Sequence, residues 1–257
     1  MSALETPRNC PDRLVETLRS ARDVLILTGA GISAESGLPT FREPLCGLWE
    51  RFNPQDLATP GAFARDPALV WGWYEWRRMK APRAAPNAAH GAIRDLQNKL
   101  PQLTLVTQNV DDLHERAGTA NVVHLHGRLS QPYCEDCRQS FTPAPEIPDE
   151  PEHGRRLDPP RCSACGSRIR PGVVWFGEPL PQGEWNIAEC AADRCDVFFC
   201  VGTSAVVYPA ASLIERAAAR GVTTVQVNPG GSDWDTHVSY NFRCAAGAML
   251  PELLKRL

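Results

Sequence analysis

The sequence has no long hydrophobic run and no apolar segment at its start. Its longest apolar stretches, residues 24–27 and 197–201, are far shorter than the ~20 residues that cross a bilayer. Residues 1–12 carry Glu5, Arg8 and two prolines where a secretory signal would have its apolar core. We therefore expect a cytoplasmic protein that does not enter a membrane.

An excess of charge of one sign is also missing. The chain has 27 Lys and Arg residues against 30 Asp and Glu, with a formal net charge of −3, and its basic residues are scattered. Nucleic acids and anionic membrane surfaces attract proteins with concentrated positive charge, so neither partner is indicated. With 257 residues, 43% of them hydrophobic, the chain is long enough to bury a sizeable core.

Four short apolar runs have the character of strands that are buried on both faces. Apolar residues at helical spacing precede the first run, and an alanine-rich helix is expected between the last two, at residues 208–220. Strands that alternate with helices predict the α/β class, with a doubly wound, Rossmann-like parallel sheet. The four runs cover residues 24–28, 103–107, 197–201 and 222–227.

Two stretches interrupt this alternation. Residues 43–85 hold four of the seven tryptophans and several prolines, which predict an irregular helical insertion of short, broken helices. Residues 128–175 are polar, rich in proline and carry four cysteines, which indicates a small inserted module. The sheet domain would then be discontinuous and consist of residues 1–42, 86–127 and 176–257.

The turn Gly29-Ala30-Gly31 follows the first apolar run, and with Ala34 it fits the pattern G-x-G-x-x-G/A. In this pattern, glycines let backbone N–H groups approach a pyrophosphate. Alone it is weak evidence, because glycine turns after strands are common. A dehydrogenase would continue with a second strand and an acidic residue about 20 positions on, whereas Pro39 and Phe41-Arg42 follow here. A dinucleotide would therefore be bound in another manner.

Two Cys-x-x-Cys pairs predict a structural zinc site. They are Cys134/Cys137 and Cys162/Cys165, separated by 24 residues, with Gly166 placed to tighten the second turn. Four thiolates close a tetrahedral zinc ion and leave no coordination position for chemistry. The alternative is a redox pair or a chance pairing, but two such pairs at this separation are far commoner in zinc sites.

Two further segments could carry a site. The segment Gln108-Asn109-Val110-Asp111 follows an apolar run, at the strand end where parallel sheets place their ligands. Capping of the next helix by Asn109 or Asp111 explains the same residues equally well. Farther on, His124 and His126 share one face of an extended segment. A lone histidine is more often structural than catalytic.

Taken together, these motifs resemble the sirtuin family. Their order and spacing match from about residue 20 to the C-terminus. The motifs are residues 29–42, Thr107 to Asp111 with Leu113-His114 and Ala117-Gly118, Leu125-His126-Gly127, the two cysteine pairs, and Gly202-Thr203-Ser204. The resemblance implies removal of acyl groups from lysines of proteins or peptides, yielding nicotinamide and O-acyl-ADP-ribose, in a cleft between the sheet domain and the zinc module. It implies NAD as co-substrate and one structural zinc ion.

The resemblance also implies roles for individual residues. His126 would be the general base, with Asn109 beside it as a catalytic residue, and Gln108, Val110 and Asp111 would line the ribose and nicotinamide pocket. A strand edge bearing Val174, Phe176 and Gly177 would pair with the substrate backbone and wall the acyl-lysine tunnel. The other cofactor residues would be Gly29, Ala30, Gly31, Ala34, Glu35, Thr40, Phe41, Arg42, Trp49, Gly202, Thr203, Ser204, Asn228 and Ala246.

Tyr74 and Arg77 match the residues that sirtuins acting on acidic acyl groups place at the end of the tunnel. Three positions apart on a helix, they would project from one face. A guanidinium binds a carboxylate through two hydrogen bonds, and a phenol adds a third donor. Without the resemblance, a surface arginine on an amphipathic helix would be favoured. Ala34 and Thr40 agree with the same subgroup, so we expect succinyl- and malonyl-lysine as preferred substrates and weaker activity on acetyl-lysine.

Two alternative functions stay open at this point. A sirtuin-like protein ADP-ribosyltransferase would use the same pocket, although an intact His126 and the Tyr74/Arg77 pair argue against it. A non-catalytic NAD sensor would bind the cofactor without releasing nicotinamide. The loop at residues 43–46 departs from the subgroup, since it is one residue longer and poorer in glycine.

Overall fold

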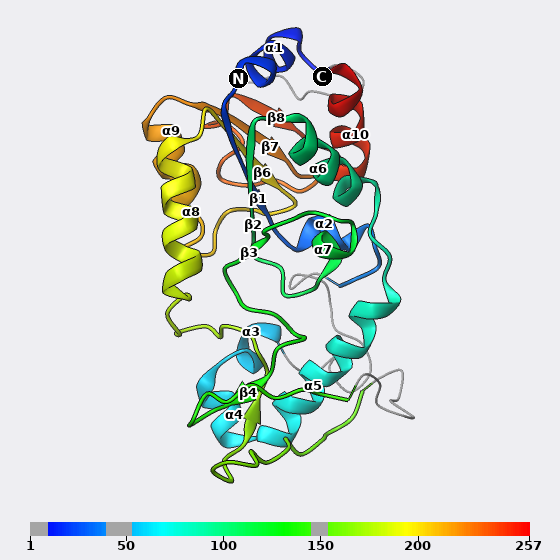
Figure 1. Cartoon of the computed structure of the whole chain (residues 1–257), viewed down its shortest axis with the longest axis vertical. Helices are drawn as coiled ribbons and strands as arrows, with labels where there is room; N and C mark the ends of the chain where they lie inside the picture. Colours follow the sequence, from blue (N-terminus) through cyan, green and yellow to red (C-terminus); the bar gives the residue numbers. More distant parts are fainter. Residues whose placement is uncertain (1–9, 40–52, 145–153) are drawn as a thin grey trace.

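The computed structural model describes residues 10–39, 53–144 and 154–257, which form a larger and a smaller lobe (Figure 1). The larger lobe is built on a six-stranded sheet with the order β3-β2-β1-β6-β7-β8, in which every neighbouring pair is parallel. This confirms the predicted α/β class. The strands are β1 (Asp23–Thr28), β2 (Gln102–Thr107), β3 (Val123–His124), β6 (Val197–Val201), β7 (Thr223–Val227) and β8 (Tyr240–Phe242).

The four apolar runs of the sequence are the central strands, with bounds within one residue of those expected. Strand β1 contributes Val24 and Ile26 to one hydrophobic core and Leu25 and Leu27 to another, so its side chains are buried on both faces. The helix expected at 208–220 is shorter, since α9 comprises Ser212–Ala219. Residues 208–211 form turns instead, and Pro209 disfavours helical geometry at Tyr208, the residue before it.

Helices cover both faces of the sheet (Figure 1). On one face lie α1 (Asp12–Ser20), α6 (Ala88–Lys99) and α10 (Ala246–Arg256), and on the other lie α8 (Gln182–Arg194) and α9. Two short helices, α2 (Ala30–Ala34) and α7 (Leu113–Arg116), follow β1 and β2. None of the helices in the described ranges has both the length and the apolar character needed to span a membrane.

The smaller lobe combines the two predicted insertions around one hydrophobic core. Phe63 and Trp73 from the first insertion pack in the same cluster as Leu129, Cys134 and Trp175. Prolines were expected to break the helices of this region, but Pro60 and Pro67 begin helices instead. Proline fits a first helical position, where its missing N–H has no partner to lose. The elements are α3 (Pro54–Leu57), α4 (Pro60–Arg65), α5 (Pro67–Lys80), a 3₁₀ turn (Ala81–Arg83), β4 (Tyr133–Cys134) and β5 (Ile169–Arg170).

The register of the sheet brings three loops to one edge. Thr28 at the end of β1 pairs with Thr107 of β2 and with Val201 of β6. The next residues continue the ladder, since Gln108 N donates to Thr28 O at 2.9 Å and Gly29 N donates to Val201 O at 3.0 Å. The loops that begin at Gly29, Gln108 and Gly202 therefore leave the sheet side by side.

Glycine is required where two of these loops cross. Gly202 has a φ of +61°, and a Cβ built there would lie 2.3 Å from Ile32 N. A Cβ on Gly31 would lie 2.8 Å from Gly202 O. The turn after β1 and the turn after β6 thus touch backbone to backbone, with no room for a side chain.

We expect Gly202→Ala to destabilise the protein much more than the matched change Gly221→Ala. Both glycines have positive φ, +61° and +73°, but a Cβ at Gly221 meets nothing within 4 Å. Urea unfolding should show a loss of about 1 kcal/mol for Gly221→Ala from backbone strain alone. For Gly202→Ala the clash should raise the loss above about 3 kcal/mol. Equal losses would contradict the close packing at Gly202.

Candidate functional site

The imidazole of His126 is held by the main chain of the neighbouring loop. Its Nδ1 lies 3.0 Å from Gln108 O, and because a carbonyl only accepts, Nδ1 carries the proton. In the neutral ring this leaves the lone pair on Nε2. Burial lowers the pKa of His126, and the hydrogen bond to Gln108 partly opposes this effect. The arrangement provides an uncharged imidazole whose basic nitrogen is Nε2.

His124 is fixed at both ring nitrogens instead. Its Nδ1 lies 3.0 Å from Asn109 O, and its Nε2 lies 2.8 Å from Glu115 Oε1. Glu115 also pairs with Arg128 at 3.3 Å. Of the two histidines expected on one face, His124 is therefore a buried support for the loop, while His126 keeps one nitrogen for chemistry. Sequence alternation alone could not tell them apart.

Asn109 and Asp111 join the loop after β2 to the turn after β1. Asn109 Nδ2 donates to Ser33 Oγ at 3.0 Å and to Gly29 O at 3.1 Å. The Ser33 hydroxyl donates to Asp111 Oδ2 at 3.0 Å, while Asp111 Oδ1 accepts from Leu113 N at the start of α7. Burial raises the pKa of Asp111, and these hydrogen bonds counteract it. Asp111 thus bonds the first N–H of α7 with one oxygen and Ser33 with the other, whereas Asp112 occupies the N-cap position.

Residues from three strand ends meet around Thr203. Gln108 Nε2 donates to Thr203 Oγ1 at 3.1 Å, and Asn228 Nδ2 donates to Thr203 O at 3.4 Å. These residues follow β2, β6 and β7. The structure therefore brings together the side chains that were expected to hold the two halves of the cofactor.

The glycine turn has a visible structural role. Gly29 N donates to Val201 O and Gly31 N donates to Gly202 O at 2.8 Å, so these two N–H groups are used within the fold. A Cβ on Gly29 would lie 2.5 Å from Thr203 Cβ. The glycines are therefore needed for close packing, and contact of this turn with a pyrophosphate stays a prediction.

The remaining cofactor residues fall into three groups. Glu35 accepts from Gly247 N at 3.0 Å, next to the buried Ala246, so it ties the end of α2 to the start of α10. Ala34 is partly buried, and Val110 packs against the core of the smaller lobe. Thr40, Phe41, Arg42, Trp49 and the loop at 43–46 lie outside the described residues.

Residues 172–174 lie beside the segment that carries His126. Val174 N donates to His126 O at 2.9 Å, and Arg128 N donates to Gly172 O at 2.7 Å. Gly127 and Val173 form an antiparallel bridge between these bonds. The segment that was expected to wall the acyl-lysine tunnel therefore begins at the main chain of His126.

The expectation of a regular strand at residues 174–178 is wrong. After the bridge the chain turns, because Gly177 has a φ of +88° and Glu178 N donates to Trp175 O at 3.0 Å. Phe176 N donates to Ala58 O at 2.9 Å, which anchors the turn to the smaller lobe. Phe176 is 43% exposed, so an apolar ring stands open to solvent two residues after the bond from Val174 to His126.

Tyr74 and Arg77 lie on α5, within the smaller lobe. Tyr74 is buried, and Trp175 Nε1 donates to its hydroxyl oxygen at 3.1 Å. The guanidinium of Arg77 lies 5.2 Å from the ring centroid of Trp73. Burial lowers the pKa of Arg77, whereas the nearby charges of Tyr74 and Asp111 raise it. Arg77 is therefore a partly buried cation that interacts with Asp111, and the alternative of a surface arginine is excluded.

Arg170 and Glu178 hold Trp175 in place, a contact that no motif of the sequence indicates. Arg170 donates to both carboxylate oxygens of Glu178, at 2.6 and 2.8 Å, and its Cζ lies 3.7 Å from the ring centroid of Trp175. Glu178 Oε2 also accepts from Trp175 N at 2.8 Å. The pair Arg170/Glu178 therefore holds the indole in place, and with it Nε1, which donates the hydrogen bond to Tyr74.

The four cysteines form a cluster that fits one metal ion. Their sulfur atoms all lie within 4.8 Å of one another. A tetrahedral zinc site with Zn–S bonds of about 2.3 Å needs sulfurs about 3.8 Å apart, and two of the pairs are 3.4 and 3.6 Å apart. Arg138 and Gly166, one residue after each pair, have φ of +61° and +79°, as tight turns around a metal require. The members are Cys134, Cys137, Cys162 and Cys165.

Comparisons with known proteins agree with this geometry. A family model described as the Sir2 family matches residues 29–209. An NAD-dependent protein deacylase of Methylococcus capsulatus is 56% identical, with 96% of each chain covered, and NAD-dependent protein deacylase 1 of Pseudomonas aeruginosa is 54% identical, with 95% of this chain and 97% of the relative covered.

Solved structures give the same result. A Sir2 homologue–NAD complex has a TM-score of 0.88 at 42% identity, covering 99% of this chain and 95% of the other. A Sir2–p53 peptide–NAD⁺ complex has a TM-score of 0.82 at 30% identity, covering 95% and 97%. The likeness thus extends over both lobes.

We expect Cys165→Ala to lose bound zinc, whereas Cys190→Ala should keep it. Cys165 belongs to the four-sulfur cluster, and Cys190 is an exposed cysteine on α8. Three remaining thiolates hold zinc more weakly, and part of the folding free energy of a small lobe comes from its metal. Elemental analysis should find one zinc per chain in the parent and in Cys190→Ala only. The melting temperature of Cys165→Ala should fall by at least about 5 °C. Full zinc content in Cys165→Ala would contradict the assignment.

Proposed function

Because the chain belongs to the Sir2 family and is an NAD-dependent protein deacylase, we propose that it prefers protein lysines carrying the short acidic acyl groups succinyl and malonyl, and removes acetyl groups more weakly. The observation that carries this proposal is the pair formed by Arg77 and Tyr74. Tyr74 is buried in the smaller lobe, and Arg77 is partly buried and lies near enough to Asp111 to interact with its charge.

The residues at the sheet edge fit an NAD molecule. Burying a carboxamide costs a few kcal/mol unless its donors and acceptors are paired, and Asn109 and Asp111 offer an amide and a carboxylate for this. Thr203, which accepts hydrogen bonds from Gln108 and Asn228, would hold the adenosine half of NAD together with Asn228. When bound, NAD supplies the ribose carbon that accepts the acyl oxygen and the nicotinamide that leaves.

His126 would act as the general base. Its Nε2 would accept the proton that a ribose hydroxyl gives up, while Nδ1 stays bonded to Gln108 O. The hydrogen bond from Val174 N to His126 O sets this base beside the segment proposed to hold the acylated peptide.

Tyr74 would donate to the acyl carboxylate. Trp175 Nε1 already donates to the phenol oxygen, so the hydroxyl proton of Tyr74 is left for another acceptor. Burial raises the pKa of Tyr74, which keeps that proton in place. With the planar fork of Arg77 one helical turn away, α5 would offer three donors to one carboxylate.

We expect the protein to remove succinyl faster than acetyl from matched lysine peptides in the presence of NAD, and Arg77→Met to reverse this order. Loss of the charge-assisted hydrogen bonds should lower kcat/KM for the succinyl peptide by about 30-fold and change that for the acetyl peptide by less than about twofold. Mass spectrometry of the peptides and of O-acyl-ADP-ribose measures both reactions.

Arg83→Met is the matched control, because Arg83 is an exposed arginine that follows α5. It should leave both rates unchanged. Trp175→Phe keeps a ring but loses the donor to Tyr74, so it should raise KM for the succinyl peptide with little change for the acetyl peptide. Faster acetyl removal by the parent protein would contradict the proposal, and label from NAD left on protein would favour an ADP-ribosyltransferase.

The pH dependence of kcat/KM should show an acid limb below pH 6.5. Burial lowers the pKa of His126 from its ordinary value of 6.5, so the unprotonated base persists as the pH falls and is lost only below that value. An acetyl peptide is the substrate of choice, because it adds no titrating carboxylate. A limb at or above pH 6.5 would contradict the assignment of His126 as the base.

A further inference from the structure

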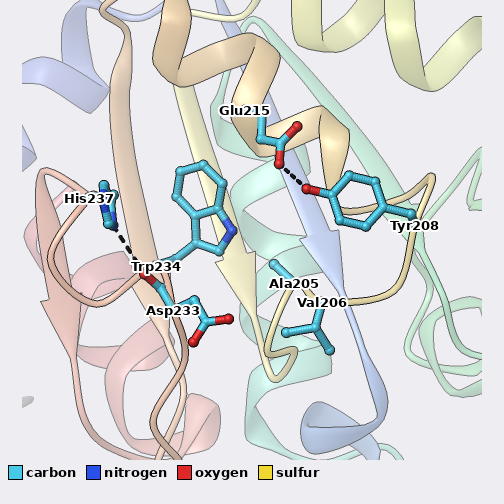
Figure 2. A pocket seen from close by; sticks show the side chains of 7 residues that line it. All are labelled: Ala205, Val206, Tyr208, Glu215, Asp233, Trp234 and His237. Carbon is cyan, nitrogen blue, oxygen red and sulfur yellow. Dashed lines mark hydrogen bonds between the residues drawn. The ribbon is translucent and has the colours of Figure 1, made fainter.

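A pocket of about 340 Å³ opens beside the carboxyl ends of β6 and β7. Figure 2 shows that its side chains come from three segments, namely the loop after β6, helix α9 and the loop between β7 and β8. The lining residues are Ala205, Val206, Tyr208, Glu215, Asp233, Trp234 and His237. Ligand pockets span roughly 300–1,000 Å³, so this one suits a single side chain better than a cofactor.

The pocket carries two carboxylates, and His237 also lines it. Glu215 and Asp233 line it, and the Tyr208 hydroxyl donates to Glu215. Within the described ranges, neither carboxylate forms an ion pair with a lysine or arginine. Arg216, which follows Glu215, pairs with Glu189 and Asp193, at 3.1 and 2.6 Å. Two uncompensated carboxylates in a concave surface attract a cation.

The indole of Trp234 lines the same pocket as these carboxylates (Figure 2). Trp234 is partly buried, and its ring meets the His237 ring edge to face, with centroids 5.9 Å apart. Tryptophan is the best aromatic partner for ammonium and guanidinium groups. An indole together with two carboxylates therefore favours an organic cation over a metal ion.

The rim of the pocket is apolar and exposed. Val206, Val207 and Tyr208 are consecutive and are 46%, 36% and 63% exposed. They follow Ser204 and Thr203, and Thr203 is bonded to Gln108 in the candidate active site. Gathered exposed apolar side chains mark surfaces that contact another chain. A polypeptide that enters the site is thus the occupant best matched to this rim.

We propose that this pocket binds an arginine or lysine side chain of the acylated substrate protein, at a position other than the acyl-lysine. The proposal rests on the deacylase function for its substrate, but not on the preference for acidic acyl groups. The protein would then select acylated lysines that have a basic neighbour.

The test uses acetyl-lysine peptides that differ at one flanking position, which carries Arg, Ala or Glu and is moved along the peptide. For at least one position, Arg should lower KM about fivefold relative to Ala, with kcat unchanged, as expected for one cation–π contact and one exposed ion pair. In Asp233→Asn and in Glu215→Gln this advantage should shrink to less than about twofold. Added salt should reduce it in the parent protein.

Asp95→Asn is the matched control. It removes a carboxylate from α6, on the opposite face of the sheet, and should keep the full preference for Arg. If Arg gives no advantage at any position, or if the advantage survives in both pocket variants, the proposal is overturned.

Calorimetry separates this proposal from the proposed function. Binding of the same peptides without an acyl group needs no reaction, so a preference for Arg that is lost in Asp233→Asn supports the pocket even if no peptide is deacylated. Absence of deacylation would count against the proposed function alone. If free arginine binds as tightly as the arginine peptide, the ligand is a small cation and the proposal is overturned.

Discussion

The parallel register between β1 and its two neighbours determines where everything else can lie. Thr28 stands level with Thr107 and Val201, so the loops after the three strands emerge together. A buried hydrogen bond from Thr28 to Thr107, at 2.8 Å, fixes this level from inside the sheet. A slip of one residue would turn the side chains to the other face and separate the loops. The position of the site is therefore set by the register of the strands, and the side chains on the three loops occupy the place that the register gives them.

Main-chain carbonyl groups position His124, His126 and Val174. Carbonyl groups of Gln108 and Asn109, adjacent in sequence, each hold one histidine ring. The carbonyl of His126 holds Val174, which starts the segment leading to Trp175. Backbone carbonyls thus hold the two histidines and Val174, whereas the final link to α5 is a side-chain hydrogen bond from Trp175 to Tyr74.

The sequence was sufficient to predict the elements whose local pattern agrees with their burial. Strands buried on both faces can be predicted because they are continuous apolar runs. The metal site could be predicted from the spacing of the two cysteine pairs alone. It failed where contacts join distant residues. Glu35 bonds to Gly247, and Trp175 bonds to Tyr74, across separations that no periodicity records. The turn at Gly177 replaced an expected strand, because backbone conformation there follows from a local hydrogen bond and a positive φ. The pocket at Trp234 likewise exists only once three segments meet.

The shared core of the smaller lobe joins the cysteine cluster to α5. Cys134 and Cys162 belong to the same buried cluster as Tyr74 and Trp175, whereas His126 is held by the edge of the parallel sheet. Loss of a metal ion from the cysteines would therefore loosen the packing around Tyr74, while the hydrogen bond between His126 and Gln108 lies outside that cluster.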